Sequence, residues 1–583
     1  MLTKPLHILL VSQSLCTRLK SKHFQLRAMS TNINNNSGTF SKAVGQIPRG
    51  YYPINEGSAT ILYGREGEAF YNKVQVFNRD LSILVIKNFD LLRRQEHDDK
   101  EKARIEKKRR YAEEDTVIPE AKQVQDLNIL EALSATGLRS VRYWKEIPNV
   151  RKIVANDIVP DAVDVIRRNL DYNDISHDKV VPHLADATEY MHRISAQKRA
   201  QQSKKTVDPE EFHVIDLDPY GGANPFLDSA VQCIGEGGLL CVTCTDMAVL
   251  SGQQPGACFA KYGSYPIRVK SCHEQALRIL LGSIQHHCSR YGRYIVPLIS
   301  LSIDFYVRVF VKVHTSQNEV KTVHQKYSNV VVCNNCENYH VQRFGDRLAN
   351  HFGKCSECGS NQKISGPIWS APIHDPTFIN KCIQHVKDNT DKFTTHKRIL
   401  GMLSVAAKEL PDSPLYYMIN SISSSLKMSV PPAHMIRSAI LNAGYLYSQS
   451  HCKGEALKTN APAQVLHDIF REYHITHCQD AKEVQEQQEQ QEGEGKVRTV
   501  KNKYDIAAIL LNKKSITAVD FTVRNDTKSG SKITGYSAFP PNPEDNWGPG
   551  KRARGHKRSR DEKNQDEAKP EAPESPESKQ VKL

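Results

Sequence analysis

Residues 213–222, with the sequence HVIDLDPYGG, combine a short apolar strand with groups that can bind a flat, polar amine. The predicted strand ends before Asp218, which is followed by Pro219, Tyr220 and two glycines. A carboxylate at the carboxyl end of a buried strand lies where open α/β sheets bind ligands, and the fixed φ of proline stiffens the turn. A carboxylate, a main-chain carbonyl and an aromatic face together suit the binding of a nucleobase with an exocyclic amino group. The alternative interpretation is an ordinary strand that ends in an Asp-Pro turn.

Two further acids follow predicted strands of the same region. Asp157 lies twenty positions after Gly137 of the turn LSATG, where an acid can accept hydrogen bonds from both hydroxyls of a ribose. Asp186 follows the predicted strand 180–184 and can accept a hydrogen bond from an adenine amino group. The turn has a single glycine, too few for the pyrophosphate of NAD, whereas S-adenosylmethionine has no phosphate to bind. The three acids therefore indicate an S-adenosylmethionine site, with helix capping as the alternative for Asp157 and Asp186.

Two CxxC pairs separated by eighteen residues have the spacing of a zinc ribbon. Two residues between cysteines let both thiolates reach one metal ion, so the sequence predicts a closed, structural zinc site without a position open for catalysis. Another CxxC, at Cys241 and Cys244, lies in a predicted strand, where residues three apart point to opposite faces. We therefore do not count it as a metal site. The four predicted ligands are Cys333, Cys336, Cys355 and Cys358.

Strands and helices alternate around these motifs, which predicts a parallel, doubly wound sheet. Two further strands, predicted to form a hairpin at the sheet edge, are expected within 296–313. Upstream, the segments TILYG and SILVIKNF are also predicted strands, and the charge run 93–115 is predicted to be a solvated helix or loop, with RNA contact as the lesser alternative. The five predicted strands of the sheet are 127–132, 152–156, 180–184, 213–217 and 237–245.

The two ends of the chain differ from its middle in composition. Residues 1–55 contain no acid and have the pattern of a mitochondrial transit peptide, with a disordered arm as the alternative, and Met29 offers a second start. A second domain is expected over 373–539. The tail 540–583 is predicted to be disordered, with a nuclear localisation signal at 551–560.

The composition bounds the class of protein. A length of 583 residues allows two or three folded units, and no apolar run approaches the roughly 18 residues that span a membrane. The net charge of +14 favours a polyanionic partner such as nucleic acid, although the basic ends contribute to it. Fourteen cysteines without a secretory signal favour a reducing compartment.

Five motifs occur in an order that closely resembles the tRNA (guanine-26) dimethyltransferase family, and its eukaryotic members in particular. They are FYNKVQVFNRDLS, EALSATGLRSVRY, NDI, LDPYGGANPFLDSA and the double CxxC, and the resemblance covers about residues 56–539. It implies a Rossmann-like methyltransferase domain over 56–372, with the zinc site inserted at 333–358, and a second, α+β domain that helps to grip tRNA. The implied reaction transfers two methyl groups from S-adenosylmethionine to the 2-amino group of guanine 26 in tRNA. The resemblance also implies residence in mitochondria and nucleus.

The resemblance assigns roles to single residues. Asp218 becomes the catalytic acid, in a site that also holds Pro219, and Phe70 and Tyr220 lie against the guanine ring. An arginine upstream of the sheet can bind the methionine carboxylate of the cofactor bidentately, with a surface ion pair as the alternative for Arg79. The implied cofactor contacts are Arg79, Arg139, Asp157, Asp186 and Ala187.

Two other functions are alternatives: a DNA amino-methyltransferase and an RNA-binding protein without catalysis. DNA amino-methyltransferases carry an acid or amide, two prolines and an aromatic residue in sequence, whereas Tyr220 follows a single proline. A zinc-dependent RNA-binding protein that has lost catalysis is the non-enzymatic alternative. The intact acids Asp157, Asp186 and Asp218 disfavour it.

Overall fold

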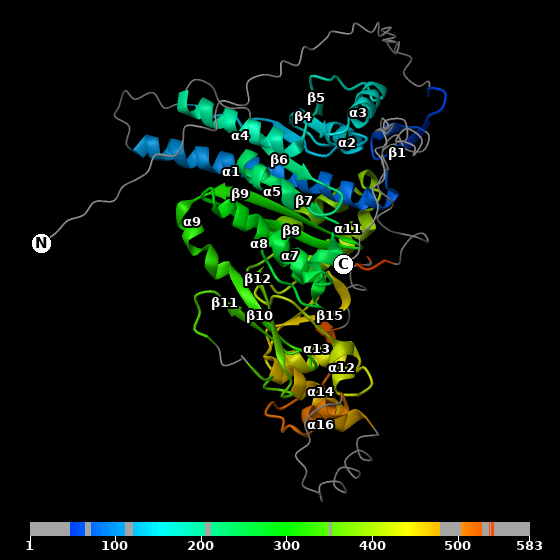
Figure 1. Cartoon of the computed structure of the whole chain (residues 1–583), viewed down its shortest axis with the longest axis vertical. Coiled ribbons are helices and arrows are strands. Elements are labelled where there is room, and N and C mark those ends of the chain that lie inside the picture. Colours follow the sequence, from blue (N-terminus) through cyan, green and yellow to red (C-terminus); the bar gives the residue numbers. More distant parts are fainter. Residues whose placement is uncertain are drawn as a thin grey trace, which may run out of the picture. The chain divides into compact units, whose positions relative to one another are not determined.

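A seven-stranded sheet with the order β5-β4-β3-β6-β7-β9-β8 forms the centre of the fold (Figure 1). The computed structural model describes residues 47–64, 71–110, 120–204, 211–348, 353–478, 503–527, 536 and 538–540. The first five strands in this order are parallel, and β9 and β8 add an antiparallel hairpin at one edge, as the sequence predicts. The strands are β3 (Leu127–Glu131), β4 (Val150–Asp157), β5 (Val180–Leu184), β6 (Phe212–Leu217), β7 (Ile234–Cys244), β8 (Arg293–Ile303) and β9 (Tyr306–Thr315).

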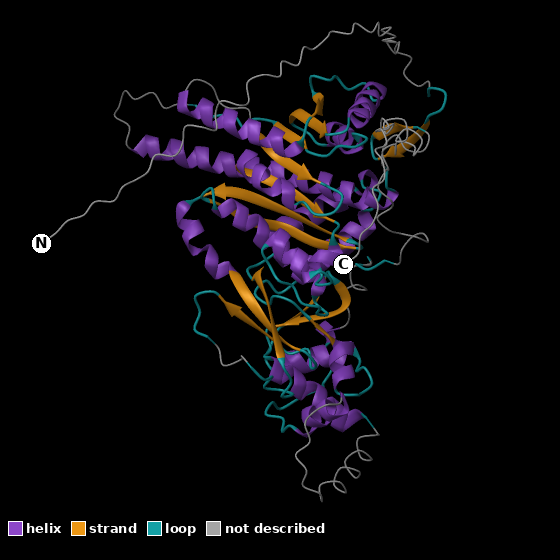
Figure 2. Cartoon of the chain, viewed as in Figure 1, coloured by secondary structure: helices purple, strands orange, loops and turns teal. Residues whose placement is uncertain are grey.

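Helices cover both faces of this sheet (Figure 2), and each face has its own hydrophobic core. Side chains of β7 alternate between the two cores: Cys244 contributes to one and Cys241 to the other. This confirms that these two cysteines point to opposite faces. The helices of the first core are α4 (Ala187–Lys204), α5 (Asn224–Cys233) and α8 (Cys272–Ser289), and those of the second are α1 (Val76–Arg110), α2 (Leu138–Glu146), α3 (Pro160–Tyr172), α10 (Pro376–Asp388) and α11 (His396–Ala406).

Helix α1 corrects one prediction, because the segment SILVIKNF is helical and not a strand. Its residues Ser82–Ile86 are fully buried on all sides of the helix, beneath the sheet. A helix that is apolar all round lacks the 3.6-residue periodicity that separates helices from buried strands in a sequence. The same helix continues through the charged residues up to Arg110, which confirms the solvated-helix interpretation for that part of the charge run.

A hairpin precedes α1 and is bound to α2 and α3. The strands β1 (Tyr52–Glu56) and β2 (Ala59–Tyr63) pair in an antiparallel fashion, so TILYG is largely a strand, as predicted. Glu56 at the end of β1 binds Arg142 of α2 at 2.8 Å, and Asn169 of α3 accepts the Leu62 amide at 2.9 Å. The hairpin is therefore bound to α2 and α3, the helices that follow β3 and β4 in the chain.

Two three-stranded sheets follow the central one. The first consists of β10 (Tyr327–Cys333), β11 (Tyr339–Arg343) and β12 (Gln362–Trp369), and the second of β13 (Tyr417–Met418), β14 (Tyr447–Ser450) and β15 (Lys453–Thr459). A third core joins them to α12 (Ile419–Ser425), α13 (Ala433–Asn442), α14 (Ala463–His477) and α16 (Lys503–Asn512). The short helices are α6 (Met247–Leu250), α7 (Pro255–Tyr262), α9 (Gln317–Thr322), η1 (Lys73–Gln75), η2 (Val323–Lys326), η3 (Thr390–Lys392) and η4 (Asn525–Thr527).

Two histidine side chains and one backbone amide from later segments bind the outer edge of β8. His374 accepts the Ser300 amide at 3.4 Å, and His451 accepts the Ser302 amide at 3.1 Å. The Asp375 amide donates to the Leu298 carbonyl at 2.9 Å.

Several predictions concern residues outside the described ranges: residues 1–46 of the predicted transit peptide or arm, Phe70, the end of the charge run and the nuclear localisation signal. Residues 47–55 of that predicted arm are described, and residues 52–55 belong to the folded strand β1. Within the described ranges, no helix is both long and apolar enough to cross a membrane.

Candidate active site and metal centre

The turn between β3 and α2 closes around Asp157, which ends β4. Asp157 Oδ2 accepts the Ala135 amide at 2.9 Å, and Oδ1 accepts the Val159 amide at 3.0 Å. The backbone of the turn is in the left-handed region at Ala135 (φ +48°) and Gly137 (φ +72°). Each carboxylate oxygen can accept a second hydrogen bond. Asp157 thus lies half-buried at the sheet edge, oriented by two amides, with lone pairs left for a ligand.

Asp186 follows β5 and caps α4. Its Oδ1 atom accepts the amides of Thr188 at 2.8 Å and Glu189 at 3.0 Å, and the side chain is exposed. Ala187 is buried as the first residue of the helix. The capping role considered for Asp186 is therefore present in the structure, and its contact with an adenine stays a prediction.

Asp218, at the end of β6, is hydrogen-bonded to the guanidinium group of Arg139 from α2. Arg139 is buried, and its other terminal nitrogen lies 3.4 Å from Asp216 Oδ2. Asp216 in turn binds Arg308 at 3.0 Å and accepts the Tyr143 hydroxyl at 2.6 Å. Asp218 itself is partly exposed, so it forms the accessible end of a buried network of charges.

Electrostatics within this network are balanced by the two arginines. Burial alone would raise the pKa of Asp216, but the guanidinium groups of Arg308 and Arg139 outweigh it and hold that pKa below its usual range. Glu131 is a third carboxylate, bound to Ser140 and 3.7 Å from Arg139 Nε. Burial raises the pKa of Glu131 to about 7. The network thus fixes the direction of the Arg139 side chain and, through it, that of Asp218.

The DPYGG turn is attached to the end of β7. The Gly221 amide donates to Thr245 Oγ1 and the Thr245 amide donates to the Gly221 carbonyl, each at 2.8 Å. Gly221 has a φ of +85°, a conformation that favours glycine. A Cβ atom on Gly222 would collide with the Tyr262 hydroxyl oxygen and Asp246 Oδ2, so a larger residue here would displace these side chains. The turn leaves the side chain of Tyr220 about half exposed.

Arg79 is engaged with Glu56. Its Nε and Nη2 atoms donate to the two oxygens of Glu56, both at 2.5 Å, and Nη2 also lies 3.1 Å from the Asn72 carbonyl oxygen. Burial would raise the pKa of Glu56, but Arg79 and Arg142 together lower it. The predicted contact of Arg79 with a cofactor carboxylate stays a prediction, and the structure brings Arg79 to a buried ion pair instead of a surface one.

The structure adds residues that the sequence analysis did not identify. Tyr143 and Arg308 bind Asp216 within the charge network, and Glu56 binds Arg79 and Arg142. Tyr143 ends the motif EALSATGLRSVRY, whereas Glu56 and Arg308 lie outside the five motifs. Asp246 is different, because it follows β7 as Asp218 follows β6. An acid after a strand was the signal used for the other three strands and would have identified it.

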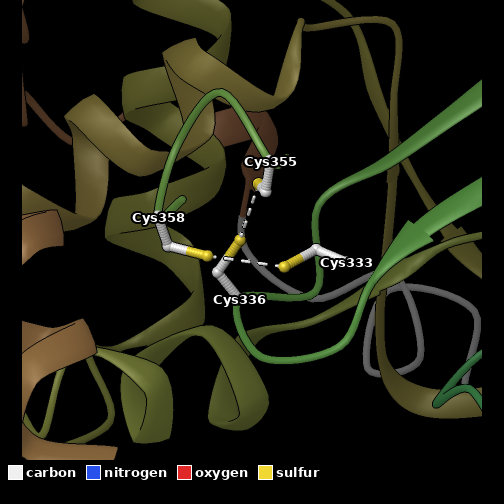
Figure 3. Close-up of side chains that lie close together, drawn as sticks. All are labelled: Cys333, Cys336, Cys355 and Cys358. Carbon is white, nitrogen blue, oxygen red and sulfur yellow. Dashed lines mark hydrogen bonds between the residues drawn. The ribbon is translucent and has the colours of Figure 1, made fainter. Parts of the chain in front are cut away.

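The four predicted cysteine ligands converge (Figure 3), and all their sulfur atoms lie within 4.8 Å of one another. Cys333 Sγ lies 3.4 Å from Cys358 Sγ, and Cys336 Sγ lies 3.5 Å from Cys355 Sγ. A tetrahedral zinc ion with bonds of about 2.3 Å would separate its sulfur ligands by roughly 3.8 Å. The amides of Asn335 and Glu357 point at Cys333 Sγ and Cys355 Sγ, each at 3.4 Å. The site fits a zinc ion held by four thiolates.

A second cluster with metal-binding residue types consists of His374, Glu409 and His451. Glu409 binds His451 Nδ1 at 2.6 Å, and its other oxygen lies 3.3 Å from the ammonium group of Lys458. A metal ion there would have to displace a proton from His451 and approach a buried lysine. The cluster is better described as an ion-pair network that connects β15 and the segment after α11 to β8.

Comparisons with known proteins agree with this geometry. A sequence model of the N2,N2-dimethylguanosine tRNA methyltransferase family matches residues 50–471. The chain is 37% identical to a tRNA (guanine(26)-N(2))-dimethyltransferase of Schizosaccharomyces pombe, over 89% of this chain and 96% of the relative. It is 38% identical to the Homo sapiens protein of the same name, over 87% of this chain and 79% of that one.

Two further similarities concern location and ligand. The chain is 36% identical to the mitochondrial tRNA (guanine(26)-N(2))-dimethyltransferase of Saccharomyces cerevisiae, over 85% of this chain and 91% of that protein. Among solved structures, the complex of Trm1 from Pyrococcus horikoshii with S-adenosyl-L-methionine superposes with a TM-score of 0.57 at 25% identity. The match covers 71% of this chain and 98% of the archaeal protein.

Proposed function

Because the chain belongs to the N2,N2-dimethylguanosine tRNA methyltransferase family, we propose that it methylates the 2-amino group of guanine 26 in tRNA twice, with S-adenosyl-L-methionine as methyl donor. It is an α/β enzyme of the methyltransferase class. The observation that carries the proposal within the molecule is Asp218, held by Arg139 at the carboxyl end of β6. Family membership sets aside both the DNA methyltransferase and the RNA-binding protein without catalysis.

We assign the chemistry at the target nitrogen to Asp218 and Pro219. The lone pair of the 2-amino group is delocalised into the guanine ring, and positive charge develops on the nitrogen as the methyl group arrives. Arg139 binds Asp218 Oδ2, so Oδ1 is the oxygen that accepts one amino hydrogen, while the Pro219 carbonyl accepts the other. S-adenosyl-L-methionine supplies an electrophilic methyl group. Because Arg139 orients the Asp218 carboxylate before the substrate binds, this group does not have to reorganise during the reaction.

Stacking is the role we propose for Tyr220 and Phe70. Chemistry on a base requires its removal from the helical stack at a cost of a few kcal/mol, and aromatic side chains offset that cost by stacking on the extruded base. The half-exposed side chain of Tyr220, two residues after Asp218, supports this role because an aromatic ring near that acid is accessible to a base.

Cofactor binding is assigned to the opposite end of the same sheet edge. Asp157 has the half-buried carboxylate and spare lone pairs that ribose hydroxyls require, and Asp186 with Ala187 lies one strand further, where the adenine would follow. Arg79 and Arg139 stay candidates for the methionine end. In the structure both are bound to carboxylates, so a cofactor carboxylate would have to share or replace those partners.

The proposal extends to metal, partner and location. We infer that Cys333, Cys336, Cys355 and Cys358 hold structural Zn²⁺, and that the part of the chain built around the third core helps to grip tRNA. The mitochondrial name of the yeast relative supports import through residues 1–28, and the basic cluster at 551–560 supports a nuclear form.

The test of the overall function uses two transcripts of one tRNA, with guanine or adenine at position 26. After incubation with the full-length protein and S-adenosyl-L-methionine, nucleosides are separated by mass spectrometry. We expect N2,N2-dimethylguanosine from the guanine transcript alone. Equal methylation of both transcripts, or none of either, would contradict the assignment.

A further inference from the structure

A second carboxylate, Asp246, lies beside the turn that carries Asp218. The strands β6 and β7 are parallel neighbours, with Leu217 opposite Val242, so their carboxyl ends meet at one edge of the sheet. A Cβ atom on Gly222 would lie 2.7 Å from Asp246 Oδ2, which shows how closely this carboxylate approaches the DPYGG turn. Asp246 is therefore next to the part of the site to which we assign the guanine ring.

Asp246 is fixed in direction and accompanied by a cation. The Tyr262 hydroxyl lies 2.9 and 3.0 Å from its two oxygens, and a carboxylate can accept about four hydrogen bonds, so acceptor capacity remains. The ammonium group of Lys261 lies 3.6 Å from Asp246 Oδ2. The Lys261 side chain is 48% exposed and that of Asp246 is 10% exposed, so the lysine is open to solvent while the acid is held in a mostly buried position.

We propose that Asp246 and Lys261 read the Watson–Crick edge of the extruded guanine; the inference rests on the proposed function. With the 2-amino group at Asp218, the next group along that edge is the N1–H donor, followed by the O6 acceptor. Asp246 accepts from N1–H, and Lys261 donates to O6. Adenine presents an acceptor at N1 and a donor at C6, the reverse of this pattern. It would leave both protein groups unpaired, which is the strongest basis a polar site has for rejecting an analogue.

A tRNA with 2-aminopurine at position 26 separates this role from catalysis. 2-Aminopurine keeps the amino group that receives the methyl, but its N1 is an acceptor and it lacks O6. The measured quantity is the ratio of kcat/KM for guanine-26 tRNA to that for 2-aminopurine-26 tRNA. Charged hydrogen bonds of this kind correspond to a preference for guanine of roughly 10- to 100-fold in the wild type.

Two variants and one control decide the matter. In Asp246→Asn the ratio should fall at least roughly fivefold, because an amide can donate to N1 of 2-aminopurine; Lys261→Met should lower it through loss of the O6 contact. Asp161→Asn, at an exposed position of α3, should leave it unchanged. The two RNAs differ at one base, so defects in folding or tRNA affinity cancel in the ratio.

The outcomes are distinguishable. An unchanged ratio in both variants overturns the proposal, even if the rate on guanine-26 tRNA falls, because Asp246 would then be structural. Should Asp246→Asn fail to fold, Lys261→Met decides alone, since its side chain is half exposed. A wild type that does not methylate guanine-26 tRNA would instead refute the proposed function itself.

Discussion

Arg139 and Arg308 each contact Asp216, and Arg139 extends the contact to Asp218 at the surface of the site. An unpaired charge in such an interior costs several kcal/mol, whereas paired charges with further hydrogen bonds are tolerated. The pairing leaves one end of the network exposed, and that end is the acid assigned to the amino group. A buried arginine is a rigid support for a catalytic carboxylate because its partners restrict every rotamer.

Replacement of Asp218 tests this arrangement directly. Asp218→Ala should reduce single-turnover methylation of guanine-26 tRNA at least ~100-fold, because loss of a group that stabilises developing charge costs about 10²–10³-fold in rate. The affinity for S-adenosyl-L-methionine, measured by calorimetry, should stay close to the wild-type value. Asp157→Ala should show the opposite pattern, with weaker cofactor binding. Near-normal turnover by Asp218→Ala would make Asp218 a structural turn residue.

The positions of Asp157, Asp186 and Asp218 were predictable because strand ends in a parallel sheet share one edge, and strand ends can be recognised in a sequence. Their partners were not. Arg139 meets Asp218 across 79 positions of chain, and Arg308 meets Ser82 across 226. Such pairs are set by tertiary packing. Arg139 lies in the motif EALSATGLRSVRY, but the motif does not predict its pairing with Asp218, and Arg308 lies outside the five motifs.

At the scale of elements, α1 shows the limit of apolar patterns. Its buried half packs in one core with the sheet, α10 and α11, and the apolar residues 83–86 are buried whichever side of the helix they lie on. The charged half carries residues such as Glu96, which binds Lys312 of β9 at 2.6 Å. One helix thus combines an apolar half with a charged half. Taken alone, the sequence of the first half predicts a buried strand, and that of the second predicts a solvated helix or loop.

The junction of β6 and β3 gives the protein a sensitivity to acid. His213 Nδ1 accepts the Asn128 amide at 2.9 Å, and burial, with the nearby Arg93 and Arg151, lowers the pKa of His213 to about 4. The unfolded chain binds this proton near pH 6.5, so stability present above that pH is lost as the pH falls from 6.5 to 4, by up to about 1.4 kcal/mol per pH unit.

An asparagine at this position keeps an acceptor near Nδ1 but does not titrate. We therefore expect the free energy of unfolding in urea to fall more steeply for the wild type than for His213→Asn between pH 6.5 and 4.5. Other buried histidines titrate in both proteins and cancel in the difference. Parallel pH profiles for the two proteins would argue against the assignment.

The cysteine cluster connects elements that share few other features. The four cysteines belong to the same core as residues of β13, α12 and α14, and Lys513 binds Glu357 of the metal loop at 2.8 Å. Structural zinc contributes apparent binding energies of about 10 kcal/mol or more. Loss of the ion should therefore destabilise this core, while the cofactor side of the sheet, which lies in other cores, is spared.

Cys355→Ser should accordingly lose zinc, become less soluble and bind tRNA more weakly, with unchanged S-adenosyl-L-methionine affinity. Cys478→Ser is the matched control, since Cys478 lies outside the cluster. Elemental analysis, filter binding and calorimetry give the three readouts. A wild-type protein that contains no zinc would contradict the prediction.

At the scale of the whole molecule, the cores suggest a later boundary between the two predicted domains. The helices α10 and α11 share a core with the central sheet, whereas Tyr417 and other residues after it belong to the third core. We propose that the second domain begins after α11 and not at residue 373. Sequence patterns locate helices and strands but do not say which core they join.

Two start sites would give two cellular addresses. Fluorescent fusions that begin at Met1 should enter mitochondria, because the acid-free segment before Met29 has the composition of an import signal. Fusions that begin at Met29 should collect in the nucleus and lose this preference when residues 551–560 are deleted. Identical distributions for the two starts would refute the dual-address hypothesis.

The two histidines that bind the edge of β8, His374 and His451, have a consequence beyond the site. An outermost strand with free amides and carbonyls is a template on which a strand of another chain can add, and proteins commonly block it with charges, bulges or covering segments. Here the cover comes from residues far along the chain: His374, Asp375 and His451 take the places that a neighbouring strand would fill. A nascent or proteolysed chain that ends before residue 373 would present this edge bare. Its hazard would be self-association through β-strand addition, however complete its catalytic residues.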